Sequence, residues 1–195
     1  MTFDFSGRAA DLGTVTAAIG RLQRRDFLRF AGAASTIGWV GSTHASLPAG
    51  VRFMNEAEAA VFTRLAQVTL PVAGSPLAPW TPDGLLQTLD GALLATMEPH
   101  ILAGLKGGVA YFDEGPLTTY KKRFTALGDV EAAQFCDAWG DSGQPPQRGL
   151  AMGLKKLVQL SYWANPATWT PLGYDGPMTQ RLGIKRLGNA ALPTR

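Results

Sequence analysis

The chain has 195 residues, of which 46% are hydrophobic and 17% are charged. This composition is typical of a soluble globular domain with a real core, and the length disfavours two large domains. The net charge is +3, but five of the 18 basic residues precede residue 46, and the remaining 13 face 12 acidic residues. Because that remainder is nearly neutral, a nucleic-acid-binding function loses its main support, and we expect no nucleic-acid partner.

Residues 1–45 have the three parts of an export signal. A polar, arginine-containing region comes first, an apolar stretch follows from Phe30 to Val40, and the small residues typical of a cleavage site end at Ala45. The apolar stretch is interrupted by glycine and is shorter than the roughly 20 apolar residues that a transmembrane helix needs. We therefore expect a leader segment and not a membrane anchor.

An arginine pair indicates which export pathway this leader uses. Arg24, Arg25, Phe27 and Leu28 stand in the order of the twin-arginine pattern, in which two arginines precede a spacer, Phe, Leu and a basic residue. The alternatives are an ordinary Sec signal or a solvated helix face. The twin-arginine translocase moves proteins that are already folded, typically with a cofactor inside, so the mature sequence should give a reason for folding before export.

The sequence from residue 46 to residue 164 predicts one helix after another. "NEAEAAVFTRLAQVTLP" begins with Asn55 as N-cap and Glu58 three residues later, and it ends before a proline. Thr81 and Pro82 begin a second helix with an apolar stripe. Further helices are expected to begin at Pro99, at Leu117, at Asp129 as an N-cap, and near Pro146. Since no stretch alternates with period two, we predict an all-α fold, an irregular bundle of about six helices.

Chemistry-bearing residues are scarce after residue 45. The fingerprints GxGxxG, GxxxxGK[ST], CxxCH and HExxH are absent, and one histidine, His100, and one cysteine, Cys136, remain. A site of soft metal ligands cannot be assembled from so few residues. We expect Cys136 to be a small buried hydrophobe and His100 to have a capping or surface role. The sequence therefore predicts no catalytic, cofactor-binding or metal-binding residue in this chain.

Residues 165–195 break the helical pattern. Prolines and glycines disfavour a long helix there, so we expect an extended C-terminal arm. Aromatic residues held by proline lose little entropy on binding and are favoured interface anchors. One alternative is that the aromatics fold back onto the helical core, and another is a disordered tail. The predicted partner-binding residues are Tyr162, Trp163, Trp169, Leu172, Gly173, Tyr174, Gly176 and Pro177.

These segments together carry a family likeness. The leader, "FMNEAEAAVFTRLAQVTLP", the run of helices and "LKKLVQLSYWANPATWTPLGYDGP" resemble the gluconate 2-dehydrogenase subunit 3 family over roughly residues 50–178. Asp175 departs from the proline that is often found in the family's Gly-Tyr-x-Gly-Pro element. The departure concerns the geometry of this turn.

The resemblance implies a non-catalytic small subunit of a periplasmic FAD-dependent sugar or alcohol dehydrogenase. In such complexes a large subunit of the glucose-methanol-choline oxidoreductase type holds FAD and lacks its own signal. It leaves the cytoplasm folded, on the small subunit's twin-arginine signal, and a multihaem cytochrome c commonly receives the electrons. This chain would then hold neither FAD nor haem c, would escort and stabilise the large subunit, and would be membrane-associated through its partners.

Two other classes of function remain open from the residues alone. One is an autonomous exported enzyme that uses an acidic pair, either Asp113 with Glu114 or Asp137 with Asp141, for acid–base chemistry. The other is a free-standing periplasmic protein, structural or ligand-binding, whose aromatic C-terminal segment holds a small ligand. The first predicts turnover by the purified chain, and the second predicts a stable monomer without a large partner.

Overall fold

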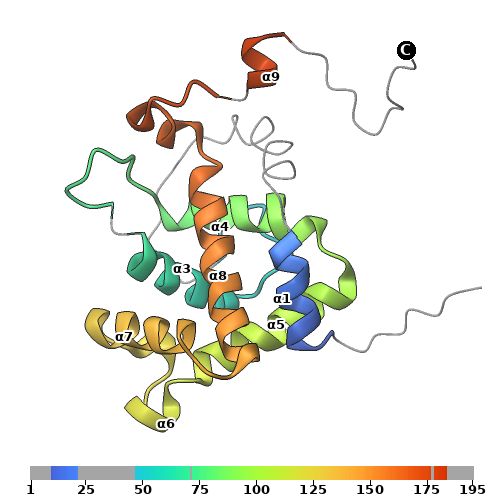
Figure 1. Cartoon of the computed structure of the whole chain (residues 1–195), viewed down its shortest axis with the longest axis vertical. Coiled ribbons are helices and arrows are strands. Elements are labelled where there is room, and N and C mark those ends of the chain that lie inside the picture. Colours follow the sequence, from blue (N-terminus) through green and yellow to red (C-terminus); the bar gives the residue numbers. More distant parts are fainter. Residues whose placement is uncertain (1–9, 22–46, 71, 177, 184–195) are drawn as a thin grey trace, which may run out of the picture.

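The computed structural model describes residues 10–21, 47–70, 72–176 and 178–183. Within these ranges the regular elements are helices and no strand occurs, which confirms the predicted all-α irregular bundle (Figure 1). Some of the residues singled out above lie outside the described ranges. They are Arg24, Arg25, Phe27, Leu28, Ala45 and Pro177.

The helices vary in length, and short irregular turns join some of them. The α-helices are α1 (Leu12–Arg21), α3 (Glu56–Thr69), α4 (Pro82–Thr88), α5 (Pro99–Glu114), α6 (Leu117–Tyr120), α7 (Asp129–Gly140), α8 (Pro145–Trp163) and α9 (Met178–Arg181). The π-helical turn is η2 (Leu89–Leu93), and the 3-10 turns are η3 (Leu94–Thr96), η4 (Phe124–Ala126), η5 (Pro166–Thr168) and η6 (Thr170–Leu172). Among the described helices, none is both long and apolar enough to cross a membrane.

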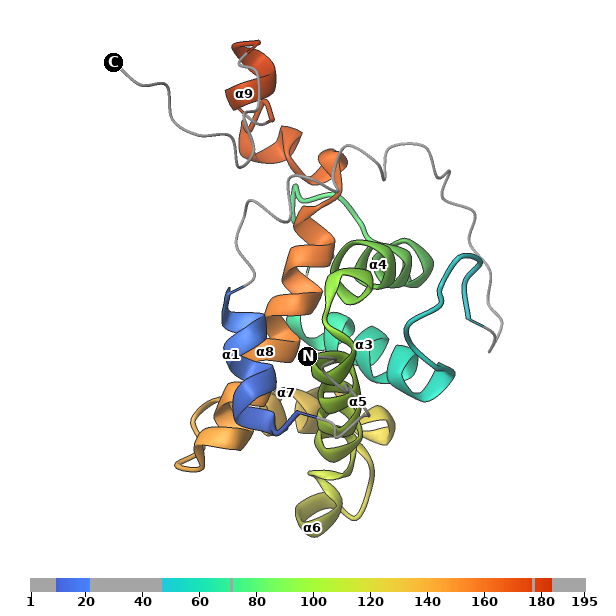
Figure 2. The same cartoon turned by 90° about the vertical axis from the view of Figure 1, so that its right-hand side faces the viewer.

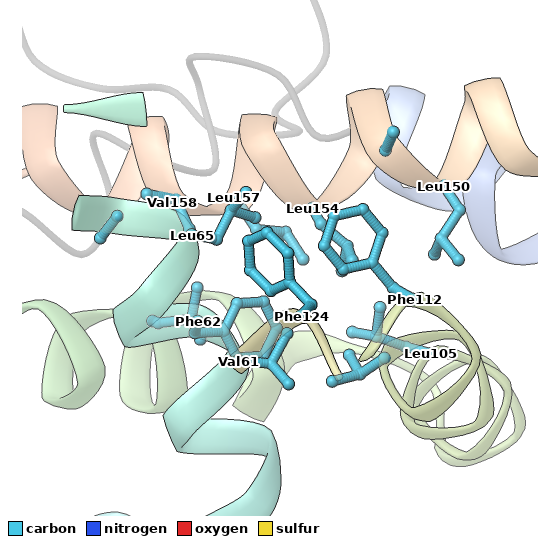
Figure 3. Close-up of a cluster of buried hydrophobic side chains, with 14 of the residues drawn as sticks. Val61, Phe62, Leu65, Leu105, Phe112, Phe124, Leu150, Leu154, Leu157 and Val158 are labelled. Carbon is cyan, nitrogen blue, oxygen red and sulfur yellow. The ribbon is translucent and has the colours of Figure 1, made fainter. Parts of the chain in front are cut away.

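Helix α8 forms the centre of the bundle. The helices α1, α3, α4, α5 and α7 and the turn η2 all pack against it (Figures 1 and 2). Its residues Leu150, Leu154, Leu157 and Val158 recur at spacings of three and four, as on one face of a helix, and all four are fully buried. Figure 3 shows them beside aromatic side chains of α3, α5 and η4, so the apolar face of α8 lies at the centre of the core.

Two predicted helix starts are confirmed in atomic detail. The Asn55 side chain accepts a hydrogen bond from the Glu58 N–H at 2.9 Å, and the Glu58 carboxylate accepts one from the Asn55 N–H at 2.9 Å. This reciprocal pair satisfies two of the free N–H groups at the start of α3. At the start of α4, the Thr81 hydroxyl accepts a hydrogen bond from the Gly84 N–H at 3.3 Å, and Pro82 is the first helical residue.

Two other helices differ from the prediction at their ends. The apolar residues Leu117, Tyr120 and Phe124 predict a helix that ends at Gly128. Helix α6 ends earlier, at Tyr120, because Lys121 takes a left-handed conformation with φ 56°. Helix α7 was expected to be capped by Asp129, which is wrong: Gly128 is the N-cap, and its N–H donates to the Glu131 carboxylate at 3.2 Å. The acidic group therefore reaches back from the third helical position instead of standing at the cap.

A buried carboxylate tethers the segment before α3 to the second predicted helix. Asp90 lies within the π-helical turn η2 and is 1% exposed. Its two oxygens accept hydrogen bonds from the Arg52 and Phe53 N–H groups, each at 2.8 Å. These donors belong to backbone 38 and 37 positions earlier in the chain, so the role of Asp90 does not follow from the local leucine pattern.

We predict that Asp90→Asn destabilises the fold. The substitution turns one acceptor oxygen into an NH2 group that faces a backbone N–H, and leaving such a buried group unpaired costs about 1–3 kcal/mol in free energy of unfolding. Urea unfolding followed by circular dichroism measures the loss. Asp137→Asn, on the exposed face of α7, is the control and should stay within about 0.5 kcal/mol of the wild type. Equal unfolding midpoints for the two variants would contradict the tether.

Candidate functional site

The candidate site is the C-terminal arm, which leaves the helical body where α8 ends. In both views the chain beyond α8 projects from one end of the bundle, and α9 lies at the far end of this projection (Figures 1 and 2). The turns η5 and η6 and the short helix α9 follow one another there, in keeping with the prolines and glycines that exclude one long helix.

The base of the arm is fixed to the body by Tyr162. Its side chain is 3% exposed, and its hydroxyl donates to the Ala78 carbonyl at 2.8 Å. Burial raises the pKa of the Tyr162 phenol. Trp163 is half-buried and packs edge-on against Tyr162, with ring centroids 4.8 Å apart. The sequence left two alternatives for this aromatic pair, a partner interface or packing onto the core. Tyr162 packs onto the core, and its side chain is not accessible to a partner.

Trp169 organises the next part of the arm. Its indole N–H donates to the Trp163 carbonyl at 2.9 Å, and its ring lies edge-on to Tyr174 with centroids 5.3 Å apart. The Tyr174 N–H donates to the Trp169 carbonyl at 3.1 Å. Gly173 and Gly176 have φ values of 65° and 94°, a region that glycine enters at little steric cost. The arm therefore has a defined local fold built around one tryptophan.

Apolar side chains on the outer side of this fold remain in water. Nine large hydrophobic side chains are exposed in the described part of the chain, and four of them lie within residues 172–182. We call these four the arm patch: Leu172, 56% exposed; Tyr174, 44%; Met178, 67%; and Leu182, 64%. Several exposed apolar side chains on one projecting segment are typical of a surface that another protein covers.

The first acidic pair considered for catalysis has a structural role. The Asp113 carboxylate accepts hydrogen bonds from the Thr125 N–H and hydroxyl, each at 3.0 Å, and from the Arg123 guanidinium at 3.2 Å. Glu114 accepts a hydrogen bond from the same guanidinium at 2.9 Å. The two carboxylates hold the pKa of Arg123 above its ordinary value. This network ties the end of α5 to η4 and occupies both acids.

The second acidic pair is exposed, and the possible metal ligands in the described part of the chain do not cluster. Asp137 and Asp141 lie one helical turn apart at the end of α7 and are exposed. His100 is exposed at the start of α5, as expected, and its carbonyl accepts a hydrogen bond from Ala10. Across the ranges that the structure describes, no three His, Cys, Asp or Glu side chains cluster as a metal site would require.

Cys136 is a buried part of the core, as its position in an apolar helix predicts. Its side chain is 5% exposed in α7 and belongs to the main hydrophobic core. Burial raises the pKa of the thiol to about 11, from an ordinary value of 9.0. Since the thiolate is the nucleophile, this cysteine is unreactive at neutral pH.

Comparison with protein-family models found no matching family, and comparisons with curated proteins and with solved structures found no match either. The likeness to the gluconate 2-dehydrogenase subunit 3 family therefore rests on the motifs quoted above. The function has to be inferred from those motifs and from the geometry of the arm.

We predict that the native Cys136 thiol resists a disulfide reagent at pH 8 and reacts only as urea unfolds the chain. The unfolded thiol ionises near pH 9 while the folded thiol keeps its proton until about pH 11. The thiol's contribution to stability is therefore complete below pH 9 and lost between pH 9 and about 11. Cys136→Ala should show a smaller loss of stability over that range. Rapid reaction of the native thiol would contradict the burial.

Proposed function

We propose that this chain is a non-catalytic small subunit that escorts and stabilises a folded, FAD-loaded dehydrogenase of the glucose-methanol-choline type through the twin-arginine pathway. The observation that carries the proposal is the arm patch, four exposed apolar side chains on the segment that projects from the body. The leader with Arg24 and Arg25 and the likeness of the C-terminal motifs to the small-subunit family support it.

The need for folded export comes from the partner's cofactor. A flavin subunit that acquires FAD in the cytoplasm must cross the membrane with its fold complete, and a twin-arginine leader on a bound escort provides that route. The partner needs no leader of its own as long as the complex forms before export. Binding also stabilises the folded partner by mass action, by about 2.7 kcal/mol when the escort is present at 100 times its dissociation constant.

The chemistry would be divided between the subunits. Oxidation of a sugar or alcohol needs a base that takes the hydroxyl proton and a flavin that takes the hydride. We assign both to the large subunit, and we assign to a multihaem cytochrome c subunit the electrons that leave the flavin. The small subunit contributes a contact surface, and its periplasmic, membrane-associated location follows from that of its partners.

We predict that Arg24→Lys together with Arg25→Lys leaves both subunits in the cytoplasm, because a translocase that reads the arginine pair no longer accepts the leader. Cell fractionation, with immunodetection of this chain and a flavin assay of each fraction, measures the outcome. Arg8→Lys is the matched control and should export normally. Unchanged periplasmic dehydrogenase activity in the double variant would contradict the escort function.

We predict that Leu172→Asp together with Met178→Asp lowers recovery of the large subunit with this chain by more than about tenfold, since interface anchors often contribute about 2 kcal/mol or more. Both side chains are more than half exposed, so the melting temperature of the isolated chain should not change. Val130→Asp is the control, because Val130 is 71% exposed on α7, away from the arm. Equal recovery with all variants would remove the arm patch from the interface.

A further inference from the structure

Helix α1 belongs to the predicted leader in the sequence but to the folded body in the structure. It packs against α8 and α5, and both views place it beside these helices (Figures 1 and 2). Its residues Val15 and Ile19 are fully buried and form part of the main core. A segment that functions only as an export signal is not expected to contribute buried residues to the core of the protein, as Val15 and Ile19 do.

The surface that receives α1 is built from glycines. We call it the α1 groove: Gly104 and Gly108 of α5, and Gly149 and Gly153 of α8. A Cβ atom at Gly104 would clash with the Ala10 carbonyl and lie 2.7 Å from Val15 Cγ2. At Gly149 it would lie 3.1 Å from Thr16, and at Gly153 it would lie 3.3 Å from Ile19.

At these three glycines the space is thus occupied by atoms of residues 10–21. A Cβ atom at the fourth glycine, Gly108, would lie 2.9 Å from Leu150 Cδ1 of α8 and 3.0 Å from Leu12 Cδ2 of α1, so both side chains fill the space there. The two glycines on each helix are four residues apart, so they lie on one face of that helix, and α1 approaches α5 and α8 closely at these faces. A glycine inside a helix destabilises it by about 0.5–1 kcal/mol relative to alanine. The packing of α1 against these four glycines offsets that loss of stability.

Polar contacts fix both ends of α1. At its start, the Ala10 N–H donates to the His100 carbonyl at 3.0 Å. At its end, the Lys156 ammonium donates to the Ile19 and Gly20 carbonyls, each at 3.0 Å. A cation at the last carbonyls of a helix satisfies free acceptors and opposes the negative end of the helix dipole. The body therefore sets both the position and the direction of α1.

Asp11 provides the local start signal of α1. Its carboxylate accepts hydrogen bonds from the Thr14 N–H at 3.1 Å and the Thr14 hydroxyl at 2.7 Å, and these bonds lower the pKa of Asp11. Even so, α1 has only 10 residues, and isolated helices shorter than about 12–15 residues are marginal in water. The helical form of this segment thus depends on the groove.

We propose that the α1 groove is a binding site for residues 10–21 that holds α1 without the covalent connection through residues 22–46. A cut after Ala45 then leaves α1 on the body instead of releasing the leader.

The test uses the full chain with a recognition site for a specific protease inserted after Ala45. The purified protein is cut and passed over a size-exclusion column, and each fraction is analysed by mass spectrometry. We expect the N-terminal fragment to elute with the body. Elution of the fragment apart from the body, whatever the state of the body, overturns the proposal. The experiment needs no partner protein, so its outcome is independent of the proposed escort function.

A matched pair of variants in α5 tests whether the groove is the cause. Gly104→Ala places a methyl group against α1 and should lower retention of the fragment by about tenfold or more, since overpacking typically costs 1–3 kcal/mol. Gly107→Ala, three residues later with no atom within 4 Å of the added Cβ, should retain the fragment as the wild type does.

Should Gly104→Ala fail to fold, Lys156→Met provides a second variant. It removes the contacts to the Ile19 and Gly20 carbonyls and should also weaken retention. Retention equal to that of the wild type in the folded groove variants would overturn the assignment of the site.

Discussion

The burial of α8 is the interaction on which the rest of the structure depends. Its apolar face holds α3 and α7, its glycine positions receive α1, and its last turn carries Tyr162. The helices around it are mostly too short to be stable alone, so their stability comes from packing against this axis. Because the hydroxyl of Tyr162 is fixed to Ala78, the arm leaves the body from a defined point.

Local signals predicted much of the fold, whereas contacts distant in sequence could not be predicted. Asn55 and Thr81 act on N–H groups three residues away, so a sequence window contains the whole interaction. Asp90 acts on backbone nearly forty residues earlier and stands in a leucine stripe that gives no sign of it. The glycines of the α1 groove were visible in the sequence, but their role appears only once α1 is seated on them.

The candidate site was predicted in part for similar reasons. The sequence indicated an arm rich in aromatic residues, and the structure places Leu172 and Tyr174 on an exposed surface. It could not indicate that Tyr162 would be buried, because a tyrosine suits an interface and a core equally well. The sequence alone could not distinguish a catalytic from a structural role for Asp113 and Glu114. In the structure Arg123 binds both carboxylates, and the Thr125 N–H of η4 binds that of Asp113. The described part of the chain thus has a glycine surface that receives α1 and exposed apolar side chains on its C-terminal arm.

The central claim is that this chain functions as the escort of a flavin enzyme. The most direct measurement is a pull-down of the tagged chain from its native cells, with an absorption spectrum of the purified material. The account predicts a stoichiometric larger subunit that carries the bands of oxidised flavin and loses them on addition of its sugar or alcohol substrate. A lone colourless chain, recovered under conditions in which weak complexes survive, would contradict it.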